Sequence, residues 1–508
     1  MILIVVQFAY IIARMYTWAE LIPILLGGEL VVVAVMMAII LNSKENPSIK
    51  LSWCFLVGIF PIFGSVVYFV IRYDLGYRLT QKRISHTEVE SRKYFPDQKQ
   101  ILTSLKEEDS QTYHIAQYLH KSCGSLVSGN NEVTYFSIGE DMFEEMLKQL
   151  ESAKEYIYLE YFMIAHGEMW NRILKVLVKK AKEGVDVRLL YDGSCSVYLL
   201  PYKYPKRIEE MGIKCRMFSP PIPFLSTHYN NRDHRKIMVI DGEVAFTGGI
   251  NLCDEYINVD SPFGHWKDVG IMLKGDAVFD FTVMFLQMWT ATESKKREAI
   301  QFSDMQKYLT KTSYSISQKH APVTKETGYV IPYADNPVDK ENVGENVYID
   351  ILNQAKEYVY IMTPYLILDN EMLSAITFAA KRGIDVRIIL PHIPDKKYAF
   401  VLAQSNYKEL LEAGVRVYEY TPGFVHAKVF VADGERAVVG SVNLDYRSLY
   451  WHYECAAYLY RVSAIEDIHR DFLETQELCN EVTHESIKKI SFLSKMAAYI
   501  LKIVAPLM

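Results

Sequence analysis

The stretch HRKIMVIDGEVAFTGGIN at residues 234–251 returns in altered form as HAKVFVADGERAVVGSVN at residues 426–443. In both copies a His and a Lys stand two residues apart, and Asp-Gly follows five residues after the Lys, between apolar, β-branched runs. Asp-Gly in this setting predicts a β-hairpin. Side chains at i and i+2 of a strand share a face, so each imidazole has an ammonium group beside it.

The expected turn also predicts which residues the hairpin brings together. A two-residue Asp-Gly turn places Gly249 and Ser441 opposite the two histidines, with Asn251 and Asn443 two residues further on. We therefore expect His, Lys, Ser or Gly, and Asn to line one face. The turn residues Asp241 and Asp433 lie away from that face, where a structural role is expected for them.

This set of side chains suits an anionic phosphate group. Lys supplies charge, Asn, Ser and backbone N–H groups donate hydrogen bonds, and His attacks or moves protons. A single HxK motif is often surface decoration, but two matching copies argue against that interpretation. A metal site is disfavoured because each His carries a Lys on its own face, which repels a cation. The pattern predicts phosphoryl or phosphatidyl transfer without a metal or other cofactor.

The duplication extends well beyond the two motifs. AKEYIYLEYFMI at 153–164 aligns with AKEYVYIMTPYLI at 355–367, and KEGVDVRLLYD at 182–192 matches KRGIDVRIILP at 381–391. A period near 200 residues indicates duplicated domains. Each unit alternates apolar strands with amphipathic helices, which predicts an α/β fold with a sheet flanked by helices. One His-Lys pair is half an active site, so we expect the two units to pack pseudo-symmetrically around one cleft.

The remaining segments complete the predicted organisation. We expect a membrane anchor at 1–75, a connector at 76–130, domains at 131–302 and 346–482, a linker at 303–345 and a basic amphipathic C-terminal helix at 483–508. That last helix contacts anionic lipid headgroups or closes the protein's own core. The proline-rich stretch SPPIPFLSTHYNN ahead of the first motif is expected to wall the cleft.

Two apolar stretches predict membrane attachment. Residues 21–41 and 51–71 each supply the roughly 20 apolar residues that a spanning helix needs. Residues 1–13 are apolar but short, so three spans stay open as an alternative to two. Basic residues follow the second stretch closely, which places the catalytic body on the cytoplasmic side of the cell membrane.

Composition narrows the possible functions further. The 508 residues are 50% hydrophobic and 23% charged, with a net charge of −6, and no basic run suggests a groove for nucleic acid. The seven cysteines are scattered without CxxC spacing. Neither a disulfide framework nor a zinc site is indicated.

The pattern HxK(x)4D followed by GGxN or GSxN resembles the two HKD motifs of the phospholipase D superfamily. The N-terminal segment and the apolar tail ending in Pro-Leu resemble those of bacterial cardiolipin synthases within it. The resemblance implies two phospholipase D-like domains and the catalytic residues His234, Lys236, Asp241, His426, Lys428 and Asp433. It implies phosphate contacts from Asn251, Asn443, Ser441 and the backbone of Gly249.

In that superfamily a carboxylate a few dozen residues downstream of each histidine orients it. The matching positions are Asp268 for His234 and Glu454 for His426, although Asp254 or Glu255 stays possible for His234 because the spacing in the first copy is six residues longer.

The activity implied by the resemblance is transfer of a phosphatidyl group from one phosphatidylglycerol to another, giving cardiolipin and glycerol through a phosphatidyl-histidine. The family suggests His234 as nucleophile and His426 as acid and base, but the symmetry of the chain leaves the order open. The alternatives are a phospholipase D hydrolase, a transferase with another donor such as phosphatidylethanolamine, a membrane-tethered nuclease, and a non-catalytic lipid-binding scaffold.

Overall fold

The computed structural model describes residues 22–72, 75–195, 199–220, 231–292, 309, 328–337, 339 and 341–507. They form two compact units. The smaller unit holds the helices of 22–72 together with those of 492–507, and the larger unit, which begins within α5 (Leu75–Ser91), holds both copies of the duplicated motif.

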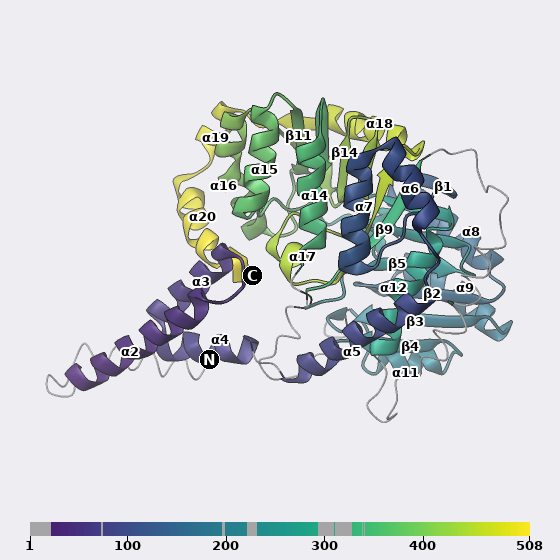
Figure 1. Ribbon diagram of the computed structural model, residues 1–508, viewed down its shortest axis with the longest axis horizontal. Coiled ribbons are helices and arrows are strands. Elements are labelled where there is room, and N and C mark those ends of the chain that lie inside the picture. The colour runs from purple at the N-terminus through teal and green to yellow at the C-terminus, as the bar shows by residue number, and fades with distance from the viewer. Residues whose placement is uncertain are drawn as a thin grey trace. The chain divides into compact units, whose positions relative to one another are not determined.

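The first half of the larger unit is built on a seven-stranded mixed sheet (Figure 1). Its strands β2, β3 and β4 run parallel, and the others pair antiparallel. The order across the sheet is β1 (Asn131–Phe136), β8 (Gly270–Gly275), β6 (Val244–Gly248), β5 (Lys236–Ile240), β2 (Tyr156–Tyr161), β3 (Asp186–Asp192) and β4 (Lys214–Phe218).

The second half repeats this sheet and adds one strand. The order is β9 (Tyr329–Asp335), β16 (Glu454–Tyr460), β15 (Arg436–Gly440), β14 (Val429–Ala432), β10 (Tyr358–Met362), β11 (Asp385–Pro391), β12 (Arg416–Tyr420) and β17 (Cys479–Glu481). The shared strands keep the same order and directions in both sheets, which confirms two duplicated α/β units with mixed sheets. β9 falls inside the segment predicted as a linker, because its apolar residues pair with β16 along seven positions.

Helices cover the outer face of each sheet. On the first half they are α8 (Gly139–Ser152), α9 (Glu168–Lys182) and α11 (Tyr204–Glu209). On the second, α14 (Val343–Gln354), α15 (Asn370–Lys381) and α16 (Lys397–Ala413) lie side by side, with α7 (Ser110–Cys123) next to α14 (Figure 1).

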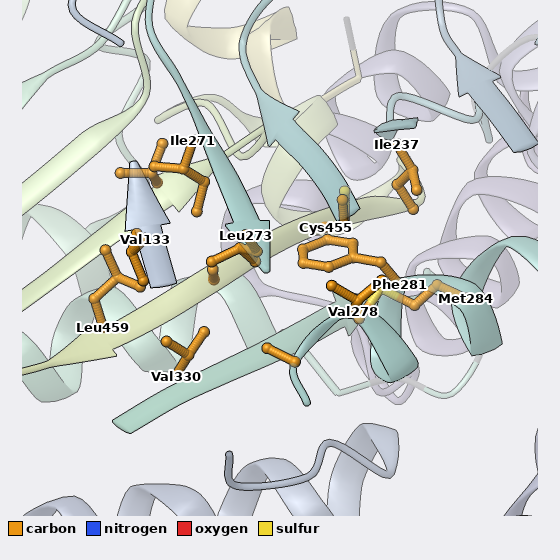
Figure 2. Packing of buried hydrophobic residues seen from close by; sticks show 14 of the residues in the cluster. Val133, Ile237, Ile271, Leu273, Val278, Phe281, Met284, Val330, Cys455 and Leu459 are labelled. Carbon is orange, nitrogen blue, oxygen red and sulfur yellow. The ribbon is translucent and has the colours of Figure 1, made fainter. Parts of the chain in front are cut away.

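The central core lies between the two sheets. α12 (Val278–Ala291) and α18 (Ala464–Glu477) each contact strands of both sheets, and every residue of α12 is buried. Figure 2 shows how side chains of both halves meet there: Ile237, Ile271, Leu273, Val330, Cys455 and Leu459 surround Val278, Phe281 and Met284 of α12. A predominantly apolar helix suits this position, since it is covered on all sides.

Two backbone connections join the halves next to the repeated motifs. β7 (His265–Lys267) pairs in parallel with β13 (Gly423–Val425), and the backbone N–H of His426 donates to the carbonyl of Lys267 at 2.7 Å. The N–H of His234 likewise donates to the carbonyl of Tyr453 at 2.9 Å. Each histidine is therefore fixed to the strand end of the opposite half.

The smaller unit contains both stretches that were predicted to span the membrane, and it divides one of them. α2 spans Ile22–Leu41, but the second stretch is divided into α3 (Pro47–Ile59) and α4 (Pro61–Arg72). Pro61 has no N–H to continue the helix and disfavours helical geometry at the residue before it. Within the described ranges, no helix is both long enough and apolar enough to cross a membrane. The possible third insertion at 1–13 lies outside the described residues.

The C-terminal segment is also divided. α19 (His484–Lys489) belongs to the larger unit, and α20 (Phe492–Val504) belongs to the smaller one. Ser491 starts the second helix, because its hydroxyl accepts the N–H of Ser494. Along α20 large apolar side chains are exposed, namely Phe492, Leu493, Tyr499 and Ile500.

Candidate active site

The turn of each motif hairpin is held by its aspartate. The carboxylate of Asp241 accepts the backbone N–H groups of Lys154, Glu155 and Tyr156 at 2.7–2.8 Å, where β2 begins. Asp433 binds Lys356, Glu357 and Tyr358 in the same way, at 2.8–3.0 Å. Both aspartates point away from the histidines, as expected, and serve the fold.

The turn is one residue longer than predicted. Ile240 pairs with Val244, and Ala432 pairs with Arg436, so each loop has three residues. The aspartate and the glycine of each loop both adopt positive φ, at 54° and 70° in the first copy. The register is therefore shifted by one, and Gly249 and Ser441 are not directly opposite His234 and His426.

Removal of the Asp241 carboxylate tests its structural role. Asp241→Ala loses three hydrogen bonds to a charged acceptor and places a Cβ-bearing residue without a local partner at positive φ, so we expect a loss of about 2–4 kcal/mol in the free energy of unfolding. Thermal and urea unfolding measure it, with Glu243→Ala as a control in the exposed part of the same turn. Equal stability of the two variants would contradict the assignment.

Each histidine is oriented by a carboxylate of the opposite half. Nδ1 of His234 lies 2.9 Å from the Glu454 carboxylate, and Nδ1 of His426 lies 2.6 Å from Asp268. Both carboxylates are fully buried. A carboxylate on Nδ1 keeps that nitrogen protonated and leaves Nε2 free to react. The halves therefore build one site jointly.

This pairing corrects the expected one. Asp268 and Glu454 are both histidine partners, but not of the histidine that precedes them in the chain. Asp254, an alternative for His234, instead accepts the backbone N–H groups of Glu168 and Met169 at the start of α9. Because Glu454 holds His234, Glu255 is not needed for that role either.

Ser441 and Gly249 lie against the two carboxylates that orient the histidines. The hydroxyl of Ser441 donates to Glu454 and accepts the N–H of Cys455 at 3.0 Å. At Gly249 an added Cβ would come within 2.1 Å of the Asp268 carboxylate. The predicted phosphate-binding role of these two residues gives way to a structural explanation: one supports Glu454, and the other leaves room for Asp268.

The close approach of Asp268 to Gly249 predicts the effect of adding a side chain at this position. Gly249→Ala displaces Asp268 from His426, so the rate of turnover falls by about 10²-fold or more while the protein stays folded. Steady-state kinetics with circular dichroism measure both quantities. Gly58→Ala is the control, since the nearest atom to its added Cβ is 3.9 Å away. Turnover at the unmodified rate in Gly249→Ala would show that Asp268 tolerates the displacement.

The two lysines are buried beside their histidines. Nζ of Lys236 donates to the carbonyl of His234, and Nζ of Lys428 lies 2.9 Å from Nδ1 of His426. Burial lowers the pKa of Lys236 to about 8, although Glu454 opposes it. Burial and the neighbouring Lys236 lower the pKa of Lys428 to about 7, against the effect of Asp268. Two ammonium groups in one buried place favour an anion between them.

Burial also sets the charge of the histidines. It lowers the pKa of His234 well below the usual value, against the opposing charge of Glu454, and together with Lys428 it lowers the pKa of His426 to about 4. Burial acts to raise the pKa of Asp268, but His426 and Lys428 lower it overall. Neutral imidazoles next to ionised carboxylates are suited to nucleophilic attack.

The two asparagines differ in their partners. The Oδ1 atom of Asn251 accepts the N–H of Met163 at 3.0 Å, and Nδ2 donates to the Tyr256 hydroxyl at 2.6 Å. The second hydrogen of Nδ2 is left to bind a substrate oxygen. The Oδ1 atom of Asn443 is buried and makes no hydrogen bond to any described residue. Both side chains are at least 96% buried, next to the histidines in sequence and space.

The motif pattern did not identify the aromatic rings around the histidines. Phe162 and His452 lie on His234, with ring centroids 4.9 and 5.3 Å away. Trp266 and Tyr256 lie on His426, at 5.2 and 5.3 Å. The sequence did contain a signal for two of these rings, because His452 and Trp266 each stand two residues before an orienting carboxylate.

His234, His452 and Glu454 also bring potential metal ligands within 4.8 Å of one another. Nζ of Lys236 lies beside this group and carries a positive charge whenever it is protonated. Histidine, carboxylate and ammonium together suit a phosphate anion better than a cation. Independence of metal stays a prediction.

Two repeated mixed sheets, each giving one His-Lys pair to a shared buried site, define the phospholipase D-like class of proteins. Residues 146–289 and 348–475 match the family model described as cardiolipin synthase, PLD-like domain. A cardiolipin synthase of Alkalihalophilus pseudofirmus is 32% identical over 511 residues, covering 99% of this chain and 98% of that protein. The chain belongs to the cardiolipin synthase family of phospholipase D-like proteins.

Two further comparisons also cover most of the chain. An uncharacterized protein of Streptococcus mutans is 50% identical over 469 residues, which cover 92% of this chain and 98% of that protein. A crystal structure of phosphatidylserine synthase from Haemophilus influenzae superimposes with a TM-score of 0.57 at 14% identity, over 78% of this chain and 98% of the other. At that identity the superposition shows the fold alone.

Proposed function

We propose that this protein is a cardiolipin synthase that transfers the phosphatidyl group of one phosphatidylglycerol to another and releases glycerol. The observation that carries the proposal is the joint site: two buried histidines, each oriented by a carboxylate of the other half and each with a buried lysine beside it. Membership of the cardiolipin synthase family supports the same substrates.

The first half-reaction breaks the bond from phosphorus to glycerol. Nε2 of the neutral His234 attacks phosphorus and forms a phosphatidyl-histidine, while His426 gives a proton to the departing glycerol oxygen. Glu454 stabilises the positive charge that develops on His234. His426 must be protonated for this step, and the negative phosphodiester favours that form because it offsets the charge of the lysines.

The second half-reaction reverses the roles. His426, now neutral, takes the proton of a terminal hydroxyl of the second phosphatidylglycerol, whose oxygen attacks phosphorus and releases His234. Lys236, Lys428, Asn443 and the free amide hydrogen of Asn251 bind the non-bridging oxygens. One phosphodiester is exchanged for another, so no external energy source is needed.

The test is incubation of the purified protein with phosphatidylglycerol alone in the presence of EDTA, followed by mass spectrometry. We expect cardiolipin and glycerol in equal amounts. Phosphatidic acid as the main product would show a hydrolase. If cardiolipin forms only after phosphatidylethanolamine is added, the donor is different, and no product with any of these lipids would favour a scaffold.

The lysines predict the alkaline limit of the reaction. Raising the pH through about 7 to 8 removes the charges of Lys428 and Lys236 in the free protein, so kcat/KM falls on the alkaline side. Lys428→Arg keeps its charge at these values and shifts the fall to higher pH. The pH dependence of kcat/KM in both proteins checks this. A profile that stays flat through both pKa values would contradict it.

The smaller unit is proposed to bind the cell membrane, with the larger unit on the cytoplasmic side. Its helices expose large apolar side chains, among them Leu30, Val31, Leu51, Phe492 and Leu493. Exposed apolar groups at this density favour a lipid surface. The basic residues that follow residue 71 support the orientation. Vesicle flotation with Phe492→Asp and Leu493→Asp together tests this contact, and unchanged flotation would contradict it.

A further inference from the structure

His452 is a buried histidine that the reaction scheme above does not use. Its side chain is 8% exposed, and among the described residues neither ring nitrogen has a partner within hydrogen-bond distance. Nδ1 lies 3.6 Å from the carboxylate of Glu454, and the ring lies 5.3 Å from that of His234, inclined by 37°. Buried polar atoms are nearly always hydrogen-bonded, so the unused hydrogen-bonding capacity of this ring, next to a reacting histidine, points to a contact with substrate.

The other half contains a counterpart in the same place. Trp266 stands two residues before Asp268, just as His452 stands two residues before Glu454. The Trp266 ring lies 5.2 Å from that of His426, inclined by 40°, and its buried N–H has no hydrogen-bond partner in the part of the chain that the structure describes. Both halves therefore hold a flat ring with an uncommitted nitrogen against the oriented histidine.

The surroundings of His452 limit what that partner can be. Nζ of Lys236 lies over the ring of Phe162 at 5.3 Å, and Phe162 stacks on His452 with ring centroids 6.4 Å apart. An imidazole always offers at least one N–H donor, whichever tautomer it adopts. Donors next to a buried ammonium group select an anionic oxygen.

We propose that His452 is a substrate-binding residue that donates a hydrogen bond to a non-bridging oxygen of the phosphodiester held at His234. This inference rests on the proposed function, since it names a further contact of the same substrate. Because Trp266 occupies the matching place in the other half, the two ends of the site differ chemically. The His234 end has a polar ring with two nitrogens, and the His426 end has an indole with one.

The test compares three variants at position 452 with phosphatidylglycerol in EDTA, which removes any metal that His234, His452 and Glu454 could hold. His452→Phe keeps a ring but no nitrogen, and we expect kcat/KM to fall about 10- to 100-fold, as for loss of a hydrogen bond to a charged group. His452→Trp and His452→Gln each restore an N–H donor, and we expect both to recover most of that loss.

A role of His452 in packing alone predicts a different order of kcat/KM among the variants. If the ring merely fills space, His452→Phe retains kcat/KM at least as well as His452→Gln, and that result would overturn the proposal. Thermal unfolding of each variant separates a folding defect from a binding defect, and His452→Gln keeps the test valid if the Phe variant does not fold.

A second readout separates failure of this inference from failure of the proposed function. Inorganic phosphate is added to the unmodified protein and to His452→Phe, and the rise in melting temperature is followed with phosphate concentration. We expect at least a tenfold weaker apparent affinity in the variant, a result that stands even if phosphatidylglycerol is not the substrate. Equal affinities in the two proteins would contradict the contact.

Discussion

Glu454→Gln is expected to lower the rate of cardiolipin formation by about 10³- to 10⁴-fold, although Glu454 and His234 lie in different halves of the chain. The neutral amide no longer stabilises positive charge on His234, and its NH₂ group favours the tautomer with the proton on Nε2, where attack on phosphorus must occur. Ser441 keeps a partner in the amide oxygen, so the packing is preserved.

The measurement is the initial rate of cardiolipin formation, with thermal unfolding to confirm the fold. Glu435→Gln is the matched control, because Glu435 forms a surface ion pair with Arg461 remote from the histidines. We expect the control to keep its rate. A Glu454→Gln rate within tenfold of the unmodified protein would contradict the orienting role.

His234→Ala and His426→Ala are each expected to reduce transfer by about 10⁴-fold or more, because one supplies the nucleophile and the other the proton. The double variant should be little worse than either single variant, since residues that act as one unit are not additive. His392→Ala, which removes a solvent-exposed histidine paired with Glu419, serves as control. Substantial transfer in either single variant would mean that the two halves do not share one site.

Much of the fold follows from sequence patterns. The repeated segments predicted two α/β units, and the structure has two mixed sheets with matching strand order. Asp-Gly predicted both hairpins, but the turn is three residues because Asp241 and Asp433 take positive φ to reach the backbone at β2 and β10. The length of a turn depends on such a tertiary contact, which a local pattern does not contain.

The crossed pairing of histidines and carboxylates could not be predicted from spacing. Sequence order places Asp268 after His234, whereas the pseudo-symmetric packing of the halves brings it to His426. The difference between Gly249 and Ser441 was visible in the motif, but its reason depends on which carboxylate lies against each. The break at Pro61 had a clear signal, since proline interrupts a helix that hydropathy alone extends.

The most direct test of the central claim uses a phosphatidyl ester of p-nitrophenol, a leaving group that departs without protonation. Release of p-nitrophenolate is measured for the single variants His234→Ala, Glu454→Gln, His426→Ala and Asp268→Asn. The crossed site predicts that Glu454→Gln behaves like His234→Ala, with little release, and that Asp268→Asn behaves like His426→Ala. In the latter two variants the first turnover is retained as a burst of release, because formation of the phosphatidyl-histidine needs no proton from His426. If Asp268→Asn instead lost the release of p-nitrophenolate as His234→Ala does, that result would contradict a site built from both halves in this way.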